Sequence, residues 1–477
     1  MASAGSADGG VGATTPLPAA QLFTLGTMNF VDTAGSMMLL PYAVPFVSHV
    51  TGIPSDSPSI GGYVGILVGI YSIMEMMLCY FWGLLADRIG RKPTLLAGLL
   101  GSAGAAVGFG FSQTFHWALF FRALDGAFCG NMGVTKTLLG EITDSTNQAR
   151  GFSLIAVAYS VGMFVGPAFG GYLSSPAAKY PAIFGEVELF KSFPFLLPNL
   201  CLAMCGLLGF FMGLVVIKEP RAGGREVSAA LVEPEQAGED QEASAEAARR
   251  SVIGQLIHAE GPFVRASIMY GCWAGYFALY SQTFILLTQL PYSAQGFQLS
   301  TADLGILQNL AALALLLSQK FGYPYLQPRM GLFKCWNLGW LAIVSSRLIY
   351  VPVALLLLSS SGARIPKVGC MAILAAIHMA GAFSAGFPCP TISVWVNRSI
   401  PTKVRGAGFG MSSAVGAACR GGFPLVGGAL FTLGRHLEAM EGSGQVLLGR
   451  YLPVLFGCCV CTIALVLGRK LPASYVQ

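Results

Sequence analysis

Apolar stretches of about twenty residues recur along this chain, and they limit its fold more than any other feature. A helix needs about 20 apolar residues to cross the hydrocarbon core of a bilayer, because no backbone amide can remain without a partner there. Such stretches fall at residues 20–47, 62–86, 94–112, 115–140, 151–173, 193–217, 262–290, 301–325, 333–358, 368–390, 404–432 and 449–468. The sequence therefore predicts an all-α membrane protein with twelve transmembrane helices.

The composition excludes a soluble protein of this length. Charged residues make up 10% of the chain and the mean hydropathy is +0.64, whereas soluble domains carry about 25% charged residues. The formal net charge of +6 is explained by attraction to anionic lipid of the inner leaflet. A lipid bilayer is therefore the expected surrounding, and no nucleic acid partner is expected.

One long polar segment divides the predicted helices into six and six. Residues 218–260 are rich in Glu and Asp and have little apolar surface to bury, which is typical of a disordered linker. The predicted organisation is a disordered cytosolic tail at 1–18, a six-helix half at 19–217, a cytosolic acidic linker at 218–260, a second six-helix half at 261–470 and a cytosolic tail at 471–477.

An internal repeat supports this division. The matches are Leu-Pro-Tyr at 40–42 and 290–292, Arg-x-Gly at 88–90 and 329–331, and Pro-x-x-Gly-Gly at 167–171 and 424–428. Their offsets are nearly equal, and each match falls on the corresponding helix or loop of its half. Two parallel six-helix repeats are typical of alternating-access carriers, which bind their solute at the interface of the repeats.

The positions of Lys and Arg predict the orientation. With a cytosolic N-terminus, sixteen Lys and Arg residues fall in segments on the cytosolic side and six on the opposite side. Both termini are therefore expected in the cytosol. The N-terminal residues lack the basic start and short apolar core of a cleaved signal peptide, and the expected location is the plasma membrane or a vacuolar membrane.

Two motifs resemble those of a known family. The loop after the second predicted helix contains Gly83, Asp87, Arg88, Gly90, Arg91 and Lys92, and it resembles the signature loop of the major facilitator superfamily. The fifth helix contains Gly162, Gly166, Pro167, Gly170 and Gly171, which resemble the helix 5 signature of the proton-linked antiporters of that superfamily. The resemblance implies the twelve-helix major facilitator fold.

Within the superfamily, the segments GEITDSTNQARGFSL and SFPFLLPNL look most like the zinc-induced facilitator-like group. That group carries a cysteine pair near its N-terminus and a Pro-Glu-Thr-x-His motif after helix 6. This chain has its first cysteine at Cys79 and reads IKEPRAGG after helix 6. No metal site is therefore expected.

The resemblance implies that the loop at 83–92 latches the inner gate. Asp87 is expected at the positive end of a neighbouring helix dipole, while the basic residues bond carboxylates such as Glu141. The alternative is a solvated basic loop that only sets orientation. In helix 5, Gly162 and Gly166 lie four apart and favour close helix contact, and Pro167 permits a bend. Their function is either a seal against leak or simple close packing.

Charges inside predicted helices mark functional candidates, because each costs about 3 kcal/mol at mid-bilayer and faces a partner or water. The acidic and basic members of this set balance one another: Asp32, Glu75 and Asp125 against Arg122, Arg347 and Arg420. Arg122 and Asp125 lie three apart on one helix face and can pair. The sequence offers no evident partner for Arg420.

Since helices 1 and 4 line the cavity in the resembled superfamily, Asp32 and Arg122 are the first candidates for proton or substrate binding, with Asp125 beside them. Protonation of a carboxylate next to an arginine releases that arginine and so couples the two events. The alternative is a purely structural Arg122–Asp125 pair.

Further candidates are Glu75 and His378. Glu75 is either a titratable site or a neutral acid that faces lipid, and His378 either titrates near neutral pH or is a hydrogen-bonded structural residue. Tyr276 and Tyr280, four apart on the seventh helix, form either the wall of a solute site or core.

The predicted function is secondary transport. The sequence has no Gly-x4-Gly-Lys-Ser/Thr loop and no His-Glu-x-x-His motif, so no enzyme activity, catalytic residues or cofactor are expected. The chain is expected to act as a monomer that exchanges protons for a small organic or metal-chelating solute. The alternatives are a uniporter or symporter, or a non-transporting receptor with the same fold.

Overall fold

The computed structural model describes residues 16–143, 147–219, 262–291, 296–359, 367–400, 405–441 and 449–471. Within these ranges the chain forms helices without strands, and helices occupy all twelve predicted spans. In the described part of the chain, nine helical segments are long and apolar enough to cross a membrane by length and composition. The all-α fold class is confirmed. The two predicted tails, apart from residues 16–18 and 471, and most of the predicted linker lie outside the described residues.

The N-terminal half begins with α1 (Ala19–Met38), η1 (Leu40–Tyr42) and α2 (Ala43–Thr51), which together form the first span. The second and third spans are α3 (Ile60–Ile89) and α4 (Arg91–Gly110), and the fourth consists of α5 (Phe115–Phe128) and α6 (Asn131–Ile142). The fifth is α7 (Gln148–Leu173). Three short helices, α8 (Pro176–Lys179), α9 (Pro181–Phe184) and α10 (Glu188–Ser192), precede the sixth span, α11 (Leu196–Val216).

The C-terminal half begins with α14 (Pro262–Gln289). The eighth span consists of α15 (Thr301–Leu317), the π-helical segment η4 (Ser318–Gly322) and α16 (Tyr323–Met330). The ninth is α17 (Leu332–Ser359), and the tenth consists of α18 (Lys367–Ala385) and α19 (Pro388–Ser399). The last two are α20 (Arg405–Glu441) and α21 (Leu452–Arg469), the latter preceded by η6 (Gly449–Tyr451).

Several predicted spans are interrupted or extended. The Leu-Pro-Tyr segment at 40–42 does not end the first span, because α2 continues to Thr51. The fourth span breaks at Cys129 and Gly130, where an added Cβ at Gly130 would overlap the Trp82 ring. The tenth breaks before Pro388, which has no amide hydrogen to continue the helix ladder.

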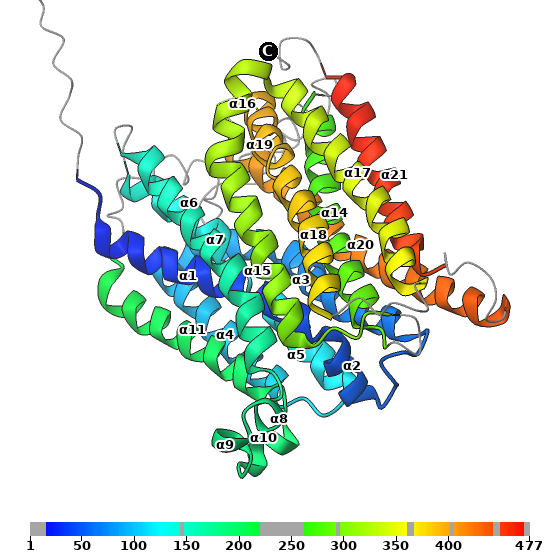
Figure 1. The fold of residues 1–477 in the computed structure, drawn as a ribbon. Coiled ribbons are helices and arrows are strands. Elements are labelled where there is room, and N and C mark those ends of the chain that lie inside the picture. The colour runs from blue at the N-terminus through cyan, green and yellow to red at the C-terminus, as the bar shows by residue number, and fades with distance from the viewer. Residues whose placement is uncertain are drawn as a thin grey trace, which may run out of the picture.

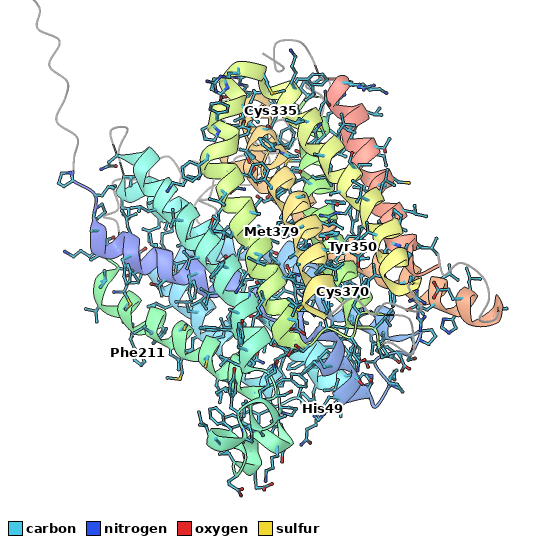
Figure 2. All side chains as sticks on the ribbon, in the orientation of Figure 1. His49, Phe211, Cys335, Tyr350, Cys370 and Met379 are labelled. Carbon is cyan, nitrogen blue, oxygen red and sulfur yellow. The ribbon has the colours of Figure 1, made fainter. Side chains whose placement is uncertain are left out.

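Apolar side chains cover the outer surface as well as the core. Phe211 of α11 points away from the bundle in Figure 2 and is 60% exposed, and Val215 on the same helix is 83% exposed. Inside the C-terminal half, Trp336, Trp340 and Trp395 are fully buried. An apolar exterior around an apolar core is what a bilayer requires of a helix bundle.

The two halves meet along two helix pairs, α3 with α20 and α7 with α15, which we call the seam. The backbones approach closely there. A Cβ at Gly65 would lie 2.7 Å from the carbonyl oxygen of Pro424, and a Cβ at Gly171 would lie 2.8 Å from that of Thr301. These contacts lie toward the end of the molecule near residues 52–59 and 174–195, the closed face. Figure 1 shows the helices of the two halves diverging from the seam toward the ends of α6 and α16.

Candidate functional site

Hydrogen bonds between the halves hold the closed face together. Lys179 Nζ donates to Thr301 Oγ1 at 2.7 Å, and also to Gly171 O at 2.6 Å and Ser174 Oγ at 2.9 Å. Further bonds between the halves include Gln289 Nε2 to Pro41 O at 2.7 Å, Gly62 N to Thr432 Oγ1 at 3.0 Å and Arg435 Nη2 to Asp56 O at 3.1 Å. The closed face is therefore sealed by polar contacts as well as by glycine packing.

An ion pair also joins the halves, further along α3 and α20. Arg420 Nη2 of α20 donates to Glu75 Oε1 of α3 at 2.8 Å. The Glu75 side chain is 21% exposed and that of Arg420 32% exposed, so the pair is only partly buried. The structure thus places Glu75 opposite a cation rather than as a neutral acid facing lipid. It also supplies the partner of Arg420 that the sequence did not show.

Two tyrosines lie near this ion pair, one from each half. The phenol groups of Tyr159 in α7 and Tyr270 in α14 lie within electrostatic range of the Arg420 guanidinium. Glu75, Arg420 and these tyrosines therefore come from four different helices. Sequence reasoning has no signal for either tyrosine, because neither lies beside a charged residue on its own helix face.

The Arg122 guanidinium lies inside the N-terminal half. Its Nη1 donates to Asp125 Oδ2 at 3.1 Å, and its Nη2 to Ser36 O at 3.5 Å. The guanidinium carbon lies 4.4 Å from the centre of the Tyr71 ring. Arg122 is only 6% exposed, so in this conformation it is a buried, paired residue and not part of the seam. This geometry matches the structural alternative for Arg122.

Asp32 borders a small cavity within the same half. The cavity has a volume of about 10 Å³, and Asp32, Tyr71, Ser102 and Asp125 are among its lining residues. A space of this size holds about one water molecule. Asp32 and Asp125 therefore line one small cavity, which has too little volume for an organic solute in this conformation.

The C-terminal half buries an arginine among aromatic rings. Arg347 of α17 is 3% exposed, its Nε donates to Tyr276 Oη at 3.0 Å, and its guanidinium carbon lies 3.3 Å from the centre of the Tyr280 ring. The other side of the guanidinium lies against Gly381 of α18, where any Cβ would overlap it. Tyr276 and Tyr280 therefore surround a resident cation and leave little surface for a solute.

His378 belongs to the same cluster. Its Nδ1 lies 2.7 Å from Tyr280 Oη, and its ring stacks on Phe284 with centroids 4.1 Å apart. The imidazole is 3% exposed. Its position between two aromatic residues matches the structural alternative for His378.

The glycines of the fifth span, α7, pack against α1. A Cβ at Gly162 would lie 2.8 Å from Phe30 O, and one at Gly166 would lie 2.6 Å from Ala34 O. Gly170 lies against Met38 in the same way, while Gly171 contacts α15 across the seam. Pro167 lies inside α7, and its carbonyl oxygen faces Gly305 of α15. The motif therefore contacts both α1 and the opposite half.

The comparison with protein families decides the family of this chain. The model of the Major Facilitator Superfamily matches residues 25–424. The chain belongs to this superfamily. The predicted twelve-helix major facilitator fold and the predicted transporter class are confirmed by this match and by the solved structures that share the fold.

Known members of the superfamily resemble the chain over different lengths. A multidrug transporter of Aspergillus fumigatus is 35% identical over 42% of this chain, which covers 34% of that relative's own length. Zinc induced facilitator 1 of Arabidopsis thaliana is 26% identical over 84% of this chain and 83% of its own length, which confirms the resemblance to that group. A bacterial homologue of the human lysosomal transporter Spinster, solved in an inward-facing and occupied conformation, has a TM-score of 0.61 at 14% identity, covering 98% of this chain and 99% of its own.

In this major facilitator protein, the loop between α3 and α4 is held by an acid that the sequence analysis missed. The backbone N–H groups of Arg91 and Lys92 donate to the Glu219 carboxylate at 2.7 and 3.0 Å, so Glu219 caps the N-terminus of α4. Lys92 Nζ donates to Leu214 O at 2.7 Å. Gly90 ends α3 with φ of +104° directly beside Glu219. These contacts join the α3–α4 loop to α11 and to the start of the predicted linker, and none of them reaches the C-terminal half.

The remaining residues of this loop make fewer contacts. Arg88 is exposed, and no atom lies within 4 Å of a Cβ built at Gly83. The side chains of Asp87 and Glu141 lie outside the described residues. The expected contact of Asp87 with a helix N-terminus and of Glu141 with the basic residues therefore remains a prediction. A signal for Glu219 exists in the sequence, as an acid placed just after the sixth span.

The described residues offer no metal centre. Among them, no group of three or more His, Cys, Asp or Glu side chains lies close enough to hold a metal ion. Charged groups described inside the spans include the Glu75–Arg420 pair, Asp32 and Asp125 at their shared cavity with Arg122 nearby, and Arg347.

Proposed function

We propose that this protein is a proton-coupled antiporter of a small organic or metal-chelating solute and that the Glu75–Arg420 pair is its coupling site. The observation that carries the proposal is this ion pair between the halves, partly exposed and formed by helices that also build the seam. Alternating access moves one half against the other, so a charge pair between them senses and controls that movement.

Protonation of Glu75 weakens the tie between the halves. A neutral carboxyl group still accepts a hydrogen bond from Arg420, but the attraction between two opposite charges is lost. A solute that requires the charged Glu75 carboxylate is excluded while the proton is bound. Proton and solute then occupy the site in turn, as antiport requires.

Asp32 serves as a second proton site in this proposal. It shares a cavity of about one water molecule with Asp125, and two carboxylates at one site favour a bound proton. Arg122, paired with Asp125, holds this cavity together, and His378 orients Tyr280 in the opposite half. The loop residues Gly83, Asp87, Arg88, Gly90, Arg91 and Lys92 act as the gate on the face opposite the closed face.

The relatives support export or sequestration of a solute. The Aspergillus relative is named a multidrug transporter, and the helix 5 residues resemble those of antiporters. We propose that the protein acts as a monomer in the plasma membrane or a vacuolar membrane. Both termini are then cytosolic, because Lys and Arg concentrate in the loops of that side. The closed face is then the extracytosolic face.

Proteoliposomes with an internal pH dye test the proposal. Zinc chloride, citrate, histidine and ethidium serve as probe solutes, and Glu75→Gln is compared with the wild type. We expect at least one probe to evoke proton flux in the wild type and Glu75→Gln to retain solute exchange without proton flux. Glu188→Gln is the matched control, since Glu188 is exposed on α10 and pairs only locally with Lys191.

Other results contradict the proposal in defined ways. Solute uptake without proton movement in the wild type identifies a uniporter, and proton flux in the same direction as the solute identifies a symporter. Unchanged proton flux in Glu75→Gln would show that the ion pair is not the coupling site. Asp32→Asn is then the next variant to test.

A further inference from the structure

The C-terminal half of the membrane part carries a large excess of positive charge. Residues 262–477 contain fifteen Lys and Arg but only three acids, Asp303, Glu438 and Glu441. Asp303 lies in the capping box at the start of α15, Glu438 bonds Arg450 at 2.9 Å near the end of α20, and Glu441 is the last residue of that helix. None of these acids is within the middle of a span, so Arg347 and Arg420 receive no acid from their own half.

The acid that balances Arg420 comes from the other half. Glu75 lies on α3, and its carboxylate is the acid that the structure pairs with Arg420. This pair is chemically asymmetric. A carboxylate becomes neutral by taking up a proton, whereas a guanidinium does not lose its proton in a protein. Whenever Glu75 leaves Arg420, a positive charge remains that no proton transfer can remove.

This asymmetry limits the solutes that fit the site. A purely cationic solute bound to Glu75 would place its charge directly beside the fixed charge of Arg420. Like charges at this distance repel strongly where water is scarce. The membrane-embedded charges of the C-terminal half, Arg347 and Arg420, are both positive and add to this repulsion.

We infer that the transported solute carries an anionic group, such as a carboxylate, sulfonate or phosphonate, that replaces Glu75 on Arg420. The inference rests on the proposed coupling pair. The guanidinium offers two parallel N–H donors to such a group, and the nearby hydroxyls of Tyr159 and Tyr270 are available as further donors. The 32% exposure of Arg420 leaves the approach open.

Whether the solute also carries a cationic group then determines whether protons move with the solute or against it. A simple anion displaces Glu75 and leaves two negative groups close together, so Glu75 takes up a proton and the proton travels with the solute. A solute that also carries a cationic group satisfies Glu75 in its charged form and excludes the proton. Antiport therefore requires a zwitterionic solute at this site.

Three probes with fixed charges test the inference in nanodiscs. They are benzenesulfonate, phenyltrimethylammonium and the zwitterion benzyldimethylammonio-propanesulfonate, and the readout is the melting temperature of the protein at increasing probe concentration. We expect both sulfonates to raise the melting temperature of the wild type and the ammonium probe to leave it unchanged. Arg420→Gln is expected to abolish the response to benzenesulfonate, while Arg469→Gln, at the exposed end of α21, keeps it.

Glu75→Gln provides an independent variant in case Arg420→Gln fails to fold. Because it removes the resident competitor for Arg420, the apparent affinity for benzenesulfonate is expected to rise about tenfold, the size of one charge-assisted hydrogen bond. Stabilisation by phenyltrimethylammonium, or an equal response of wild type, Arg420→Gln and Glu75→Gln to both sulfonates, overturns the inference. If the sulfonate response depends on Arg420 but Glu75→Gln still couples protons in liposomes, the anion site stands and the proposed coupling site fails.

Discussion

Arg122 in the N-terminal half and Arg347 in the C-terminal half are both buried, and the two arginines are accommodated differently. Arg122 in the N-terminal half pairs with Asp125 at 3.1 Å. Arg347 in the C-terminal half has the Tyr276 hydroxyl at 3.0 Å and the face of Tyr280 at 3.3 Å. The first charge is neutralised by an acid, and the second is only stabilised by dipoles and a ring quadrupole. The N-terminal half is therefore locally neutral, while the C-terminal half retains a positive interior.

Breaking the neutral pair is expected to have the largest effect. Asp125→Leu leaves Arg122 buried without its acid, which is expected to lower the free energy of unfolding by about 3–5 kcal/mol. Steric-trap or denaturant unfolding in bicelles measures this loss. The double variant Arg122→Met/Asp125→Leu is expected to recover most of it, and a double variant no more stable than the single one would show that the charge is not the cause.

Disturbing the aromatic cluster is expected to cost less. Gly381→Ala adds a methyl group where the Arg347 guanidinium lies, so the guanidinium must move off the Tyr280 ring at a cost of about 1–3 kcal/mol. Gly104→Ala is the control, because no atom lies within 4 Å of a Cβ built there. Equal unfolding free energies for the two variants would mean that Arg347 moves freely.

Removing one hydroxyl from the cluster tests its hydrogen bonding alone. Tyr280→Phe retains the ring over Arg347 but loses the bond to His378 Nδ1, and a loss of about 1 kcal/mol is expected. The matched control is Tyr325→Phe, since Tyr325 also lies under an arginine, Arg329, but is 62% exposed. A loss of equal size in the control would assign the effect to the phenol itself rather than to burial.

Lys179 extends the comparison to a third cation, one that can lose its charge. Burial lowers the pKa of Lys179, in α8 at the closed face, to about 8 from an ordinary value of 10.5. The unfolded chain therefore binds more protons than the native one between these values, and the contribution of Lys179 to stability rises with pH from about 8 to about 10.5.

The pH dependence of the melting temperature between pH 7 and pH 10 measures this effect. Lys179→Met is expected to remove the Lys179 part of the rise. Lys191→Met is the control, because Lys191 lies on α10 and bonds only the exposed Glu188. Identical pH profiles for wild type and Lys179→Met would contradict the shifted pKa.

Sequence reasoning succeeded where the signal was local. Apolar runs placed all twelve spans, because the bilayer imposes one length on every spanning helix. The Arg122–Asp125 pair was an explicit alternative, since two residues three apart on a helix share a face. Helix breaks at Gly130 and before Pro388 were missed, although both residues are visible in the sequence, because their effect depends on the packing around them.

The contacts that matter most for the proposed mechanism are not local. Glu75 and Arg420 are 345 residues apart, and no periodicity within either helix indicates that they meet. The same holds for Glu219, which caps a helix 127 residues earlier in the chain. Tertiary structure alone brings such groups together, so the sequence could name Glu75 and Arg420 as unusual without pairing them.

The glycine contacts of the seam affect how fast the two halves can separate. Where Gly65 meets Pro424 and Gly171 meets Thr301, backbone lies close to backbone, so parting these points disengages few side chains. The same seam also holds Phe431 against Gly61, Leu425 against Gly69 and the Glu75–Arg420 ion pair. The kinetic barrier to separation is then set by these side-chain contacts and the hydrogen bonds of the closed face, and exchange within the microsecond to millisecond range of domain motions is expected.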